Sequence, residues 1–281
     1  MPTLLRRLRL GKGSCKAIKE KSEFDFKVTK NPDDIPDNEL VFRWGCTATI
    51  PAEIRTVNKA SAIHLVNDKL AFRKLLEEKS LCPRTIWKDC GWSLACPDRP
   101  VIVRPQVHHQ GRHLYVANSE EELEEAIIKC GEGWYASEYI DKIAEYRVFI
   151  VQGRTVCVAS KTPKDPSAVA WNVFQGGKFE NVNWADWPLR AVRVATEAFA
   201  LSGLDFGGVD IMEDKDGEVY VLEINSAPSL TSPYRQSCFA KAFDWIVKYG
   251  TKPIKLIGDK GGYRKFIHPA VCEEALLTGE H

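Results

Sequence analysis

The sequence predicts a mixed fold of the α/β and α+β classes, and three observations lead to this prediction. Short candidate strands and helices alternate near the amino terminus, longer strands follow in the second half, and one hairpin there carries carboxylates. The chain has 281 residues, of which 44% are hydrophobic and 27% are charged. That composition can bury a core and excludes wholesale disorder, and the length allows one large domain or two to three small subdomains that share a cleft.

Residues 1–66 predict a small α/β unit. We expect strands near Pro2–Leu8, Phe24–Thr29 and Leu40–Arg43, and a helix near Ser14–Glu20. The proline-rich stretch Asn31–Asp37 predicts a loop. The unit is too short for a full doubly wound domain.

Residues 67–137 predict a second unit that begins with a helix. Asn67 and Asp68 should cap a helix over Lys69–Lys79, because its apolar residues recur at helical spacing and share one face. Another helix begins at Ser119, where glutamates fill the first turn and complement the helix dipole, so this acidic cluster needs no ligand. The expected strands are Arg84–Trp87, Val101–Arg104, Leu114–Val116 and Trp134–Glu138.

Residues 138–250 predict a third unit with longer strands. An amphipathic helix is expected at about Pro188–Leu201. The segment Asp214–Gly217 has the residues of a tight turn, so the strands on either side should form a hairpin. Beyond this unit the helix and strand patterns weaken, so residues 251–281 predict a tail. The expected strands are Tyr146–Val151, Thr155–Ser160, Gly208–Met212 and Glu218–Ile224.

The hairpin carries an unusual set of polar residues. Strand alternation places Val219, Val221, Glu223 and Asn225 on one face, and Asp210 on the first strand can reach the same face. A buried carboxylate is costly without a compensating cation. Carboxylate and amide oxygens suit Mg²⁺ held together with nucleotide phosphates. A salt-bridged acidic strand end is the alternative.

Several motifs elsewhere occur in the order of one known architecture. They are Lys69, Arg104, "HHQGR" at 108–112, "SEYI" at 137–140, "EYR" at 145–147, "SK" at 160–161 and "NVFQGG" at 172–177, followed by "GGVDI" and "VLEINSAPSL". From Asn58 to Leu230 the chain resembles the ATP-grasp superfamily, and most closely its glutathione-synthetase/RimK-type amino-acid ligases. The resemblance implies an ATP-grasp fold, in which a lid (67–137) and a metal- and phosphate-binding subdomain (138–250) sandwich ATP behind a reduced amino-terminal unit.

The resemblance also implies roles for individual residues. Arg104 stands where the family usually has a lysine, and Glu145 and Lys161 also depart in residue type. The implied Mg²⁺ ligands, for two ions with Mn²⁺ as a substitute, are Asp210, Glu223 and Asn225. The implied ATP contacts are Lys69, Arg104, Gly111, Arg112, Glu138, Tyr139, Ile140 and Glu145. The residues implied to face the γ-phosphate and the acyl acceptor are Arg147, Lys161 and Asn172.

The implied activity is that of an ATP-dependent carboxylate–amine ligase that works through an acylphosphate. Its partners would be a small-molecule or peptide carboxylate and an amine, and a homo-oligomer stays open. Two other functions share the same motifs: a small-molecule kinase of the same fold, and an ATP-binding module without turnover. Arg147, Lys161 and Arg235 indicate an anionic partner.

Composition and other motifs exclude several classes of protein. No apolar run reaches the roughly 18 residues of a membrane span. Nine scattered cysteines without a C-x-x-C pair indicate reduced thiols and a cytoplasmic location. The residues Leu10–Ser14 lack P-loop spacing, and no G-x-S-x-G elbow is present. The histidines at 108, 109 and 113 leave a metal site as a weaker alternative.

Charge gives one further indication. The net charge of the chain is +1, so nucleic-acid binding is not expected overall. The first thirty residues, however, contain nine Lys or Arg and three acidic residues, a net charge of +6. Such a run is either an arm that touches phosphates or an acidic partner, or simply a solvated face.

Overall fold

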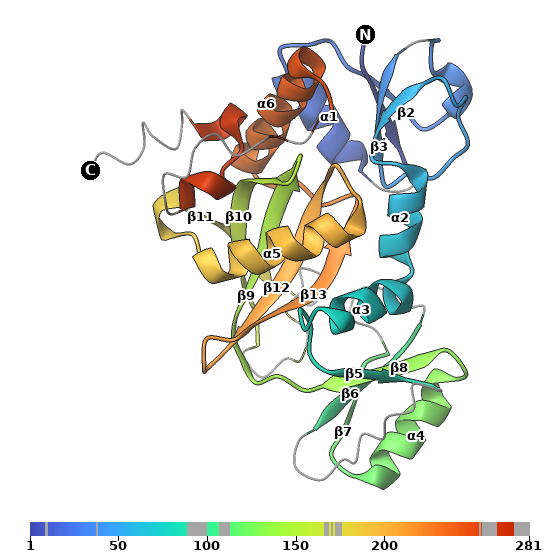
Figure 1. Cartoon of the computed structure of the whole chain (residues 1–281), viewed down its shortest axis with the longest axis vertical. Helices are drawn as coiled ribbons and strands as arrows, with labels where there is room; N and C mark the ends of the chain where they lie inside the picture. Colours follow the sequence, from blue (N-terminus) through green and yellow to red (C-terminus); the bar gives the residue numbers. More distant parts are fainter. Residues whose placement is uncertain are drawn as a thin grey trace.

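The computed structural model describes residues 1–8, 11–37, 39–88, 100–106, 113–165, 169, 171, 176–252, 254 and 263–272. Three sheets follow one another along the long axis (Figure 1). The amino-terminal sheet lies at one end, the lid sheet lies at the other, and a five-stranded sheet lies between them.

The amino-terminal unit is a four-stranded parallel sheet in the order β2-β1-β3-β4. The three expected strands and the expected helix are present, whereas β4 and α2 were not predicted. Asn31 caps a short 3-10 helix, Pro32–Asp34, inside the proline-rich loop. The elements are β1 (Thr3–Arg6), α1 (Lys12–Lys21), β2 (Lys27–Thr29), β3 (Leu40–Trp44), β4 (Arg55–Val57) and α2 (Ala60–Asn67).

Helix α3 (Lys69–Glu78) begins where the sequence predicts it. The Asp68 carboxylate accepts a hydrogen bond from the Ala71 N–H at 3.0 Å, which is the expected N-cap. Phe72 and Leu76 are buried on its inner face. Figure 1 shows α3 between the central sheet and the lid.

The lid is a four-stranded antiparallel sheet in the order β5-β8-β6-β7, with α4 packed against β6 and β7. Its own hydrophobic core includes Ile86, Val103 and Ala136. Phe72 and Leu76 of α3 belong instead to the main core. We therefore propose that the lid begins near residue 84 and that α3 belongs with the central sheet. The elements are β5 (Thr85–Trp87), β6 (Val101–Pro105), β7 (Tyr115–Ala117), α4 (Glu120–Cys130) and β8 (Trp134–Glu138).

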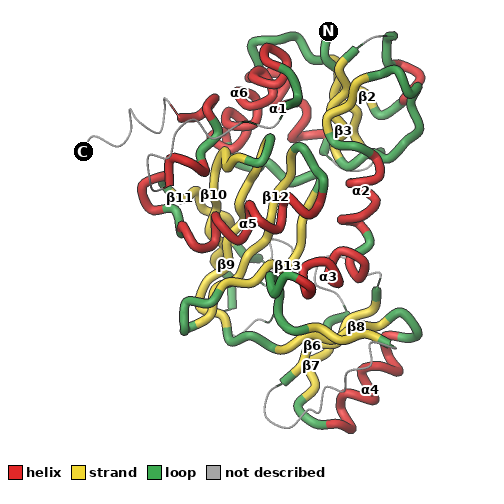
Figure 2. The backbone as a smooth tube through the Cα atoms, viewed as in Figure 1, coloured by secondary structure: helices red, strands yellow, loops and turns green. Residues whose placement is uncertain are grey.

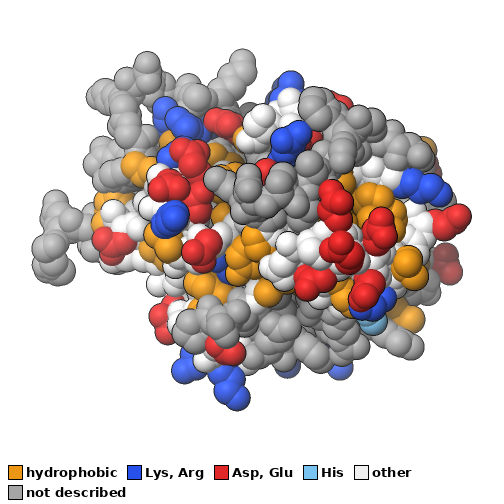
Figure 3. Space-filling view, turned by 90° about the horizontal axis from the view of Figure 1, so that it is seen from below, with side chains coloured by type: hydrophobic (Ala, Val, Ile, Leu, Met, Phe, Trp, Pro, Cys, Tyr) orange, Lys and Arg blue, Asp and Glu red, His pale blue; other side chains and the backbone are white. Residues whose placement is uncertain are grey.

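The start of α4 has the structural explanation that the sequence predicted for its glutamates. The Ser119 hydroxyl accepts a hydrogen bond from the Glu122 N–H at 3.2 Å. Hydrogen bonds from the backbone and side chain of Asn118 lower the pKa of Glu122. Seen from the lid end, the surface carries acidic side chains beside exposed hydrophobic ones (Figure 3).

The central sheet is antiparallel, in the order β11-β10-β9-β12-β13. Helix α5 covers one face of it (Figure 2), and α6 covers part of the other, against β10. Strand β11 was not predicted, and β9 begins earlier than expected. The elements are β9 (Lys142–Val151), β10 (Arg154–Thr162), β11 (Lys178–Val182), a 3-10 turn (Trp184–Asp186), α5 (Leu189–Ser202), β12 (Phe206–Asp214), β13 (Val219–Asn225) and α6 (Pro233–Tyr249).

The predicted hairpin between β12 and β13 is confirmed. The Asp214 carboxylate accepts hydrogen bonds from the N–H groups of Asp216 and Glu218, at 2.9 and 2.8 Å. Gly217 has a φ of 75°, a conformation that glycine adopts without the steric cost of a Cβ.

Helix α6 was not predicted, although Ser232 and Pro233 form a good helix start. Its apolar residues do not keep to one stripe, because the helix lies between the amino-terminal unit and the central sheet. Phe243 stacks on Phe42 at 4.4 Å between ring centroids, and Phe239 meets Phe149 at 5.9 Å. The amino-terminal unit and the central sheet therefore share one core.

Part of the expected tail packs onto the protein. Tyr263–Phe266 forms a 3-10 helix, and Ile267 and His268 are buried. The His268 N–H donates to the Thr155 carbonyl at 2.9 Å. Among the described helices, none combines the length and apolar character needed to cross a membrane.

Candidate active site

A β-bulge decides which way the carboxylates of the hairpin point. Asp210 pairs with Glu223, whereas the next residue, Ile211, pairs with Val221. Leu222 is therefore an extra residue on β13. Directly paired side chains lie on the same face of a sheet, so Asp210 and Glu223 share a face, in agreement with the prediction.

The prediction that Val219, Val221, Glu223 and Asn225 all share one face is wrong. The bulge reverses the alternation of side chains at Leu222, so the two valines face the core beneath α5. Glu223 and Asn225 face the other side, which we call the site face. An inserted residue breaks the period of two on which the prediction depended.

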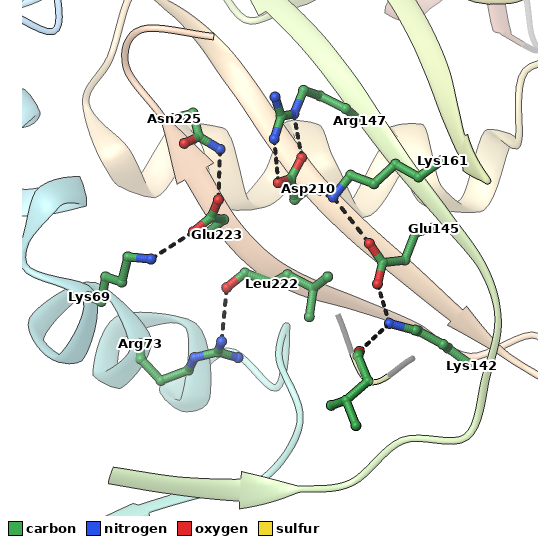
Figure 4. Close-up of polar contacts among 11 residues, drawn as sticks. Lys69, Arg73, Lys142, Glu145, Arg147, Lys161, Asp210, Leu222, Glu223 and Asn225 are labelled. Atoms are coloured by element: carbon green, nitrogen blue, oxygen red, sulfur yellow. Dashed lines mark hydrogen bonds and ion pairs between the residues drawn. The ribbon is translucent and has the colours of Figure 1, made fainter. Parts of the chain in front are cut away.

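Arg73 of α3 supports the bulge (Figure 4). Its Nη1 donates to the Val221 carbonyl at 3.2 Å and its Nη2 to the Leu222 carbonyl at 2.8 Å. Buried carbonyls that leave a sheet ladder need other donors, and this guanidinium supplies them. The contact also fixes α3, and with it Lys69, against the carboxylate strand.

Glu223 lies between a cation and an amide. Lys69 Nζ donates to its Oε2 at 2.9 Å, and Asn225 Nδ2 donates to its Oε1 at 3.2 Å. Burial alone would raise the pKa of Glu223, but the positive charges of Lys69, Arg147 and Lys161 outweigh burial and hold the pKa well below its usual range. Glu223 is therefore a carboxylate at neutral pH.

Asp210 is held by two cations from neighbouring strands. Arg147 binds it through two hydrogen bonds, Nε to Oδ1 at 2.5 Å and Nη2 to Oδ2 at 2.7 Å. Lys161 Nζ lies 3.1 Å from Oδ2. Gly208 makes room for this arrangement, because a Cβ there would lie 3.3 Å from Arg147 Cδ. Burial disfavours the charge on Arg147, but Asp210 outweighs burial and raises its pKa.

Glu145 extends this network toward the start of β9. It is only 3% exposed, and its two oxygens contact Lys142 and Lys161, the latter at 3.1 Å. Lys142 also donates to the Val169 carbonyl at 2.6 Å and lies 4.8 Å from the Trp171 ring. Glu145 thus pairs with lysines of β9 and β10. Its implied role as a ribose ligand stays a prediction.

Phe179 of β11 forms an aromatic wall beside these cations. The Arg147 guanidinium lies 4.9 Å from its ring centroid, and Lys161 Nζ lies 5.6 Å from it. An aromatic face attracts cations, so this ring helps to keep both side chains on the site face.

Arg104 reaches the same region from the lid. Its Nη1 donates to the Ser137 hydroxyl at 3.0 Å, and its guanidinium lies 5.7 Å from the Tyr135 ring. Burial lowers the pKa of Arg104, and the nearby positive charge of Arg73 lowers it further. The contact with Tyr135 acts in the opposite direction and raises the pKa. The structure thus places Arg104 and Lys69 at the boundary between the lid and the central sheet.

The last residue of β8 and the two residues after it are the ones expected to contact adenine. The Glu138 N–H donates to the Arg84 carbonyl at 3.0 Å, and the Tyr139 N–H donates to the Pro100 carbonyl at 2.9 Å. Both N–H groups are therefore engaged within the lid. The side chains of Glu138, Tyr139 and Ile140 are half-buried, and their adenine contacts stay a prediction.

Three of the implied site residues, Gly111, Arg112 and Asn172, lie outside the described residues. The same holds for His108 and His109 of the alternative metal site. Among the described residues, no group of three or more His, Cys, Asp or Glu side chains could hold a metal ion.

Sequence reasoning missed three residues that shape this site: Arg73, Lys142 and Phe179. Arg73 lies one helical turn after Lys69, so it is expected on the same face of α3. Lys142 and Phe179 have no local signal, because their role depends on pairing between β9, β10 and β11.

The site can accept an anionic ligand and a hard cation. Five described cations from α3, the lid and the central sheet face three carboxylates, which leaves positive charge for phosphates. Asp210, Glu223 and Asn225 fit Mg²⁺, because Asn225 uses its Nδ2 on Glu223 and keeps its oxygen for another partner. The cations are Lys69, Arg104, Lys142, Arg147 and Lys161, and the carboxylates are Glu145, Asp210 and Glu223.

Comparisons with known proteins identify the family of this chain. A family model described as "RimK-like ATP-grasp domain" matches residues 95–244, more than half of the chain. A "Probable alpha-L-glutamate ligase 2" of Hahella chejuensis is 26% identical over 226 residues, which are 74% of this chain and 72% of that protein. A "Probable alpha-L-glutamate ligase" of Vibrio parahaemolyticus is 28% identical over 191 residues, 62% of this chain and 60% of that protein.

A solved structure shows the same fold. The D-alanine–D-alanine ligase from Bacillus anthracis, in complex with ATP, superposes with a TM-score of 0.60. The match covers 89% of this chain and 96% of that one at 15% sequence identity. The predicted ATP-grasp fold is thereby confirmed.

Proposed function

The chain belongs to the RimK-like ATP-grasp family of ATP-dependent ligases, and from this premise we propose that it joins the carboxylate of a small molecule or peptide to the amino group of glutamate. The names of the two bacterial relatives support glutamate. This chain spans 72% of one relative and 60% of the other, so the substrate assignment belongs to the proposal.

One observation carries the proposal. Asp210, Glu223 and Asn225 lie together on the site face, among cations that come from α3, β9 and β10. Such an arrangement can neutralise a triphosphate and stabilise the charge that develops on its transferring phosphoryl group. The kinase alternative gains no support from the family match.

The first step activates the substrate carboxylate. A carboxylate oxygen attacks the γ-phosphorus of ATP, the bond to the bridging oxygen breaks, and ADP leaves. We assign Lys69 and Arg104 to the phosphates and Arg147 and Lys161 to the transferring group. Asp210, Glu223 and Asn225 would hold Mg²⁺, two ions by our expectation with Mn²⁺ as a substitute, which supplies charge neutralisation at the phosphates.

The second step forms the amide. The neutral amine attacks the carbonyl carbon of the acylphosphate, the C–O bond to phosphate breaks, and phosphate and a proton are released. Positioning of the two reactants accounts for most of the expected acceleration. Closure of the lid would exclude water that otherwise hydrolyses the acylphosphate.

A hydroxylamine trap tests the proposal. The full chain is incubated with Mg·ATP, hydroxylamine and a panel of carboxylates, and hydroxamates and ADP are quantified. We expect hydroxamate and ADP in equal amounts, and we expect EDTA to abolish both. A stable phosphorylated product without hydroxamate would indicate a kinase, and ATP binding without ADP would indicate a binding module.

A further inference from the structure

Arg235 is a buried cation in an unfavourable position. It lies in the first turn of α6, where Ser232 is the N-cap, and its side chain is only 3% exposed. A helix N-terminus carries partial positive charge, so an arginine there is repelled rather than stabilised. Burial removes hydration as well. Such a charge needs compensation from its surroundings.

The described surroundings supply only neutral partners. Arg235 Nε donates to Asn181 Oδ1 and to Ser232 Oγ, each at 2.9 Å, and Nη2 donates to the Phe179 carbonyl at 3.2 Å. Within the described ranges, no carboxylate forms an ion pair with Arg235, and Nη1 makes no hydrogen bond. Burial lowers the pKa of Arg235, and the positive charge of Arg147 lowers it further. The Cys157 thiol acts in the opposite direction and raises the pKa.

Two neighbouring cations behave differently. Arg147 is neutralised by Asp210, and Lys161 by Glu145 and Asp210. All three cations surround the Phe179 ring, with the Arg235 guanidinium 5.9 Å from its centroid. Arg235 is therefore the member of this group that lacks an acidic partner among the described residues.

The hydrogen bonds of Arg235 place it on the β11 side of the site face. Its partners Asn181 and Phe179 lie on β11, and the guanidinium also lies 6.0 Å from the Phe149 ring of β9. In the sheet order β11-β10-β9-β12-β13, the expected metal ligands lie on β12 and β13, on the opposite side of β9. A nucleotide whose phosphates lie over those ligands would leave the β11 side of the site face for the second substrate.

We propose that Arg235 binds the side-chain carboxylate of the glutamate whose amino group is joined; this inference rests on the proposed function. Neither carboxylate of that glutamate is phosphorylated in the reaction, so its side-chain carboxylate keeps its charge throughout. Asn181, Ser232 and the Phe179 carbonyl hold the guanidinium in place and leave Nη1 for the substrate. Arginine offers two or more donors to one carboxylate, which favours acids over neutral amides.

Steady-state kinetics with glutamate and with glutamine, its neutral isostere, test this proposal. Arg235→Gln should raise KM for glutamate on the order of a hundredfold and abolish the preference for glutamate over glutamine. KM for ATP should change by no more than about threefold, because ATP contacts other residues. Arg235→Lys should restore part of the preference for glutamate. The matched control is Arg190→Gln, an exposed arginine paired with Glu218, which should leave all constants unchanged.

Several results would overturn the proposal. One such result is that Arg235→Gln leaves the ratio of KM for glutamine to KM for glutamate unchanged. Another is that Arg235→Gln raises KM for glutamate and KM for ATP equally. If Arg235→Gln does not fold, calorimetric titration of the unmodified chain with each amino acid in the presence of Mg·ADP decides the question, and equal affinities refute the role of Arg235. An unmodified chain that forms neither ADP nor hydroxamate refutes the proposed function and this inference together, whereas an active chain with an unchanged Arg235→Gln ratio refutes only the inference.

Discussion

The two faces of the central sheet differ sharply although they share the same strands. Beneath α5, residues such as Val148, Val209 and Ile211 are fully buried and apolar. On the site face, Arg147 and Asp210 are the neighbours of those same residues in the chain; both are charged, Asp210 is buried and Arg147 is partly buried. The face beneath α5 is thus apolar at these positions, whereas the site face carries charges near the lid and packs Phe149 against Phe239 of α6 farther along.

Retaining buried charges carries a cost in stability. Desolvation of an ion pair often exceeds the Coulomb energy gained, so an apolar pair of similar volume is frequently as stable or more so. The site face nevertheless keeps Asp210, Glu223 and their cations. We infer that ligand binding, and not stability, accounts for them, and adjacent residues of β12 allow the two faces to be tested separately.

The largest effect is expected from Asp210→Asn. The substitution keeps the shape but removes the charge that pairs with Arg147 and Lys161 and that would bind the metal. The rate of hydroxamate formation should fall by about 10²–10³-fold. The control is Asp216→Asn in the exposed turn of the same hairpin, which should retain full activity. Activity of Asp210→Asn within tenfold of the unmodified chain would remove the site face from the chemistry.

The neighbouring residue should behave in the opposite way. Ile211→Ala removes buried methyl and methylene groups beneath α5 and should lower the free energy of unfolding by about 2–5 kcal/mol. Its rate per folded molecule should stay within a few-fold. Urea unfolding and kinetics on the same sample measure both quantities, and Ile143→Ala, at an exposed position of β9, is the control. A loss of rate comparable to that of Asp210→Asn would show that the faces are not separable.

A smaller, pH-dependent effect is expected at His268, a buried group with no oppositely charged partner among the described residues. Burial lowers its pKa to about 3, and Arg154 adds to this. The folded state keeps the ring neutral, whereas the unfolded state binds a proton below about pH 6.5. Stability from this group is therefore present above pH 6.5 and is lost as the pH falls, by about 2 kcal/mol between pH 6.5 and 5.

Urea unfolding at pH 7 and pH 5 measures this loss. His268→Gln should lose less stability over this interval than the unmodified chain. His64→Gln, at an exposed position of α2, should follow the unmodified chain. Parallel losses in all three proteins would mean that His268 is protonated in the folded state.

Local sequence patterns predicted much of the fold. The cap at Asp68, the glutamates after Ser119 and the turn at Gly217 are each decided by neighbouring residues, and each is present. Helix α6 was missed because its burial depends on distant segments, and β11 was missed because it is defined by its pairing with β10. A helix packed on two sides lacks the single apolar stripe that periodicity detects.

In the candidate site, too, the sequence predicted some features and only the tertiary structure arranged the others. The types of residue at Asp210, Glu223 and Asn225 indicated oxygen ligands, but their common face depends on a bulge that the alternation of side chains did not reveal. Arg73 supports that bulge from another helix. Lys142 and Phe179 became part of the site only through strand pairing.

The sequence alone determined the capped helices, the hairpin and the kinds of chemical group available, because helix caps, turns and apolar periodicity act over a few residues. Tertiary structure decided which groups meet. Arg147 and Asp210 are 63 residues apart, and only the pairing of β9 with β12 brings them into contact. A one-residue bulge turned Glu223 toward the cations, since in a sheet an inserted residue moves every later side chain to the opposite face.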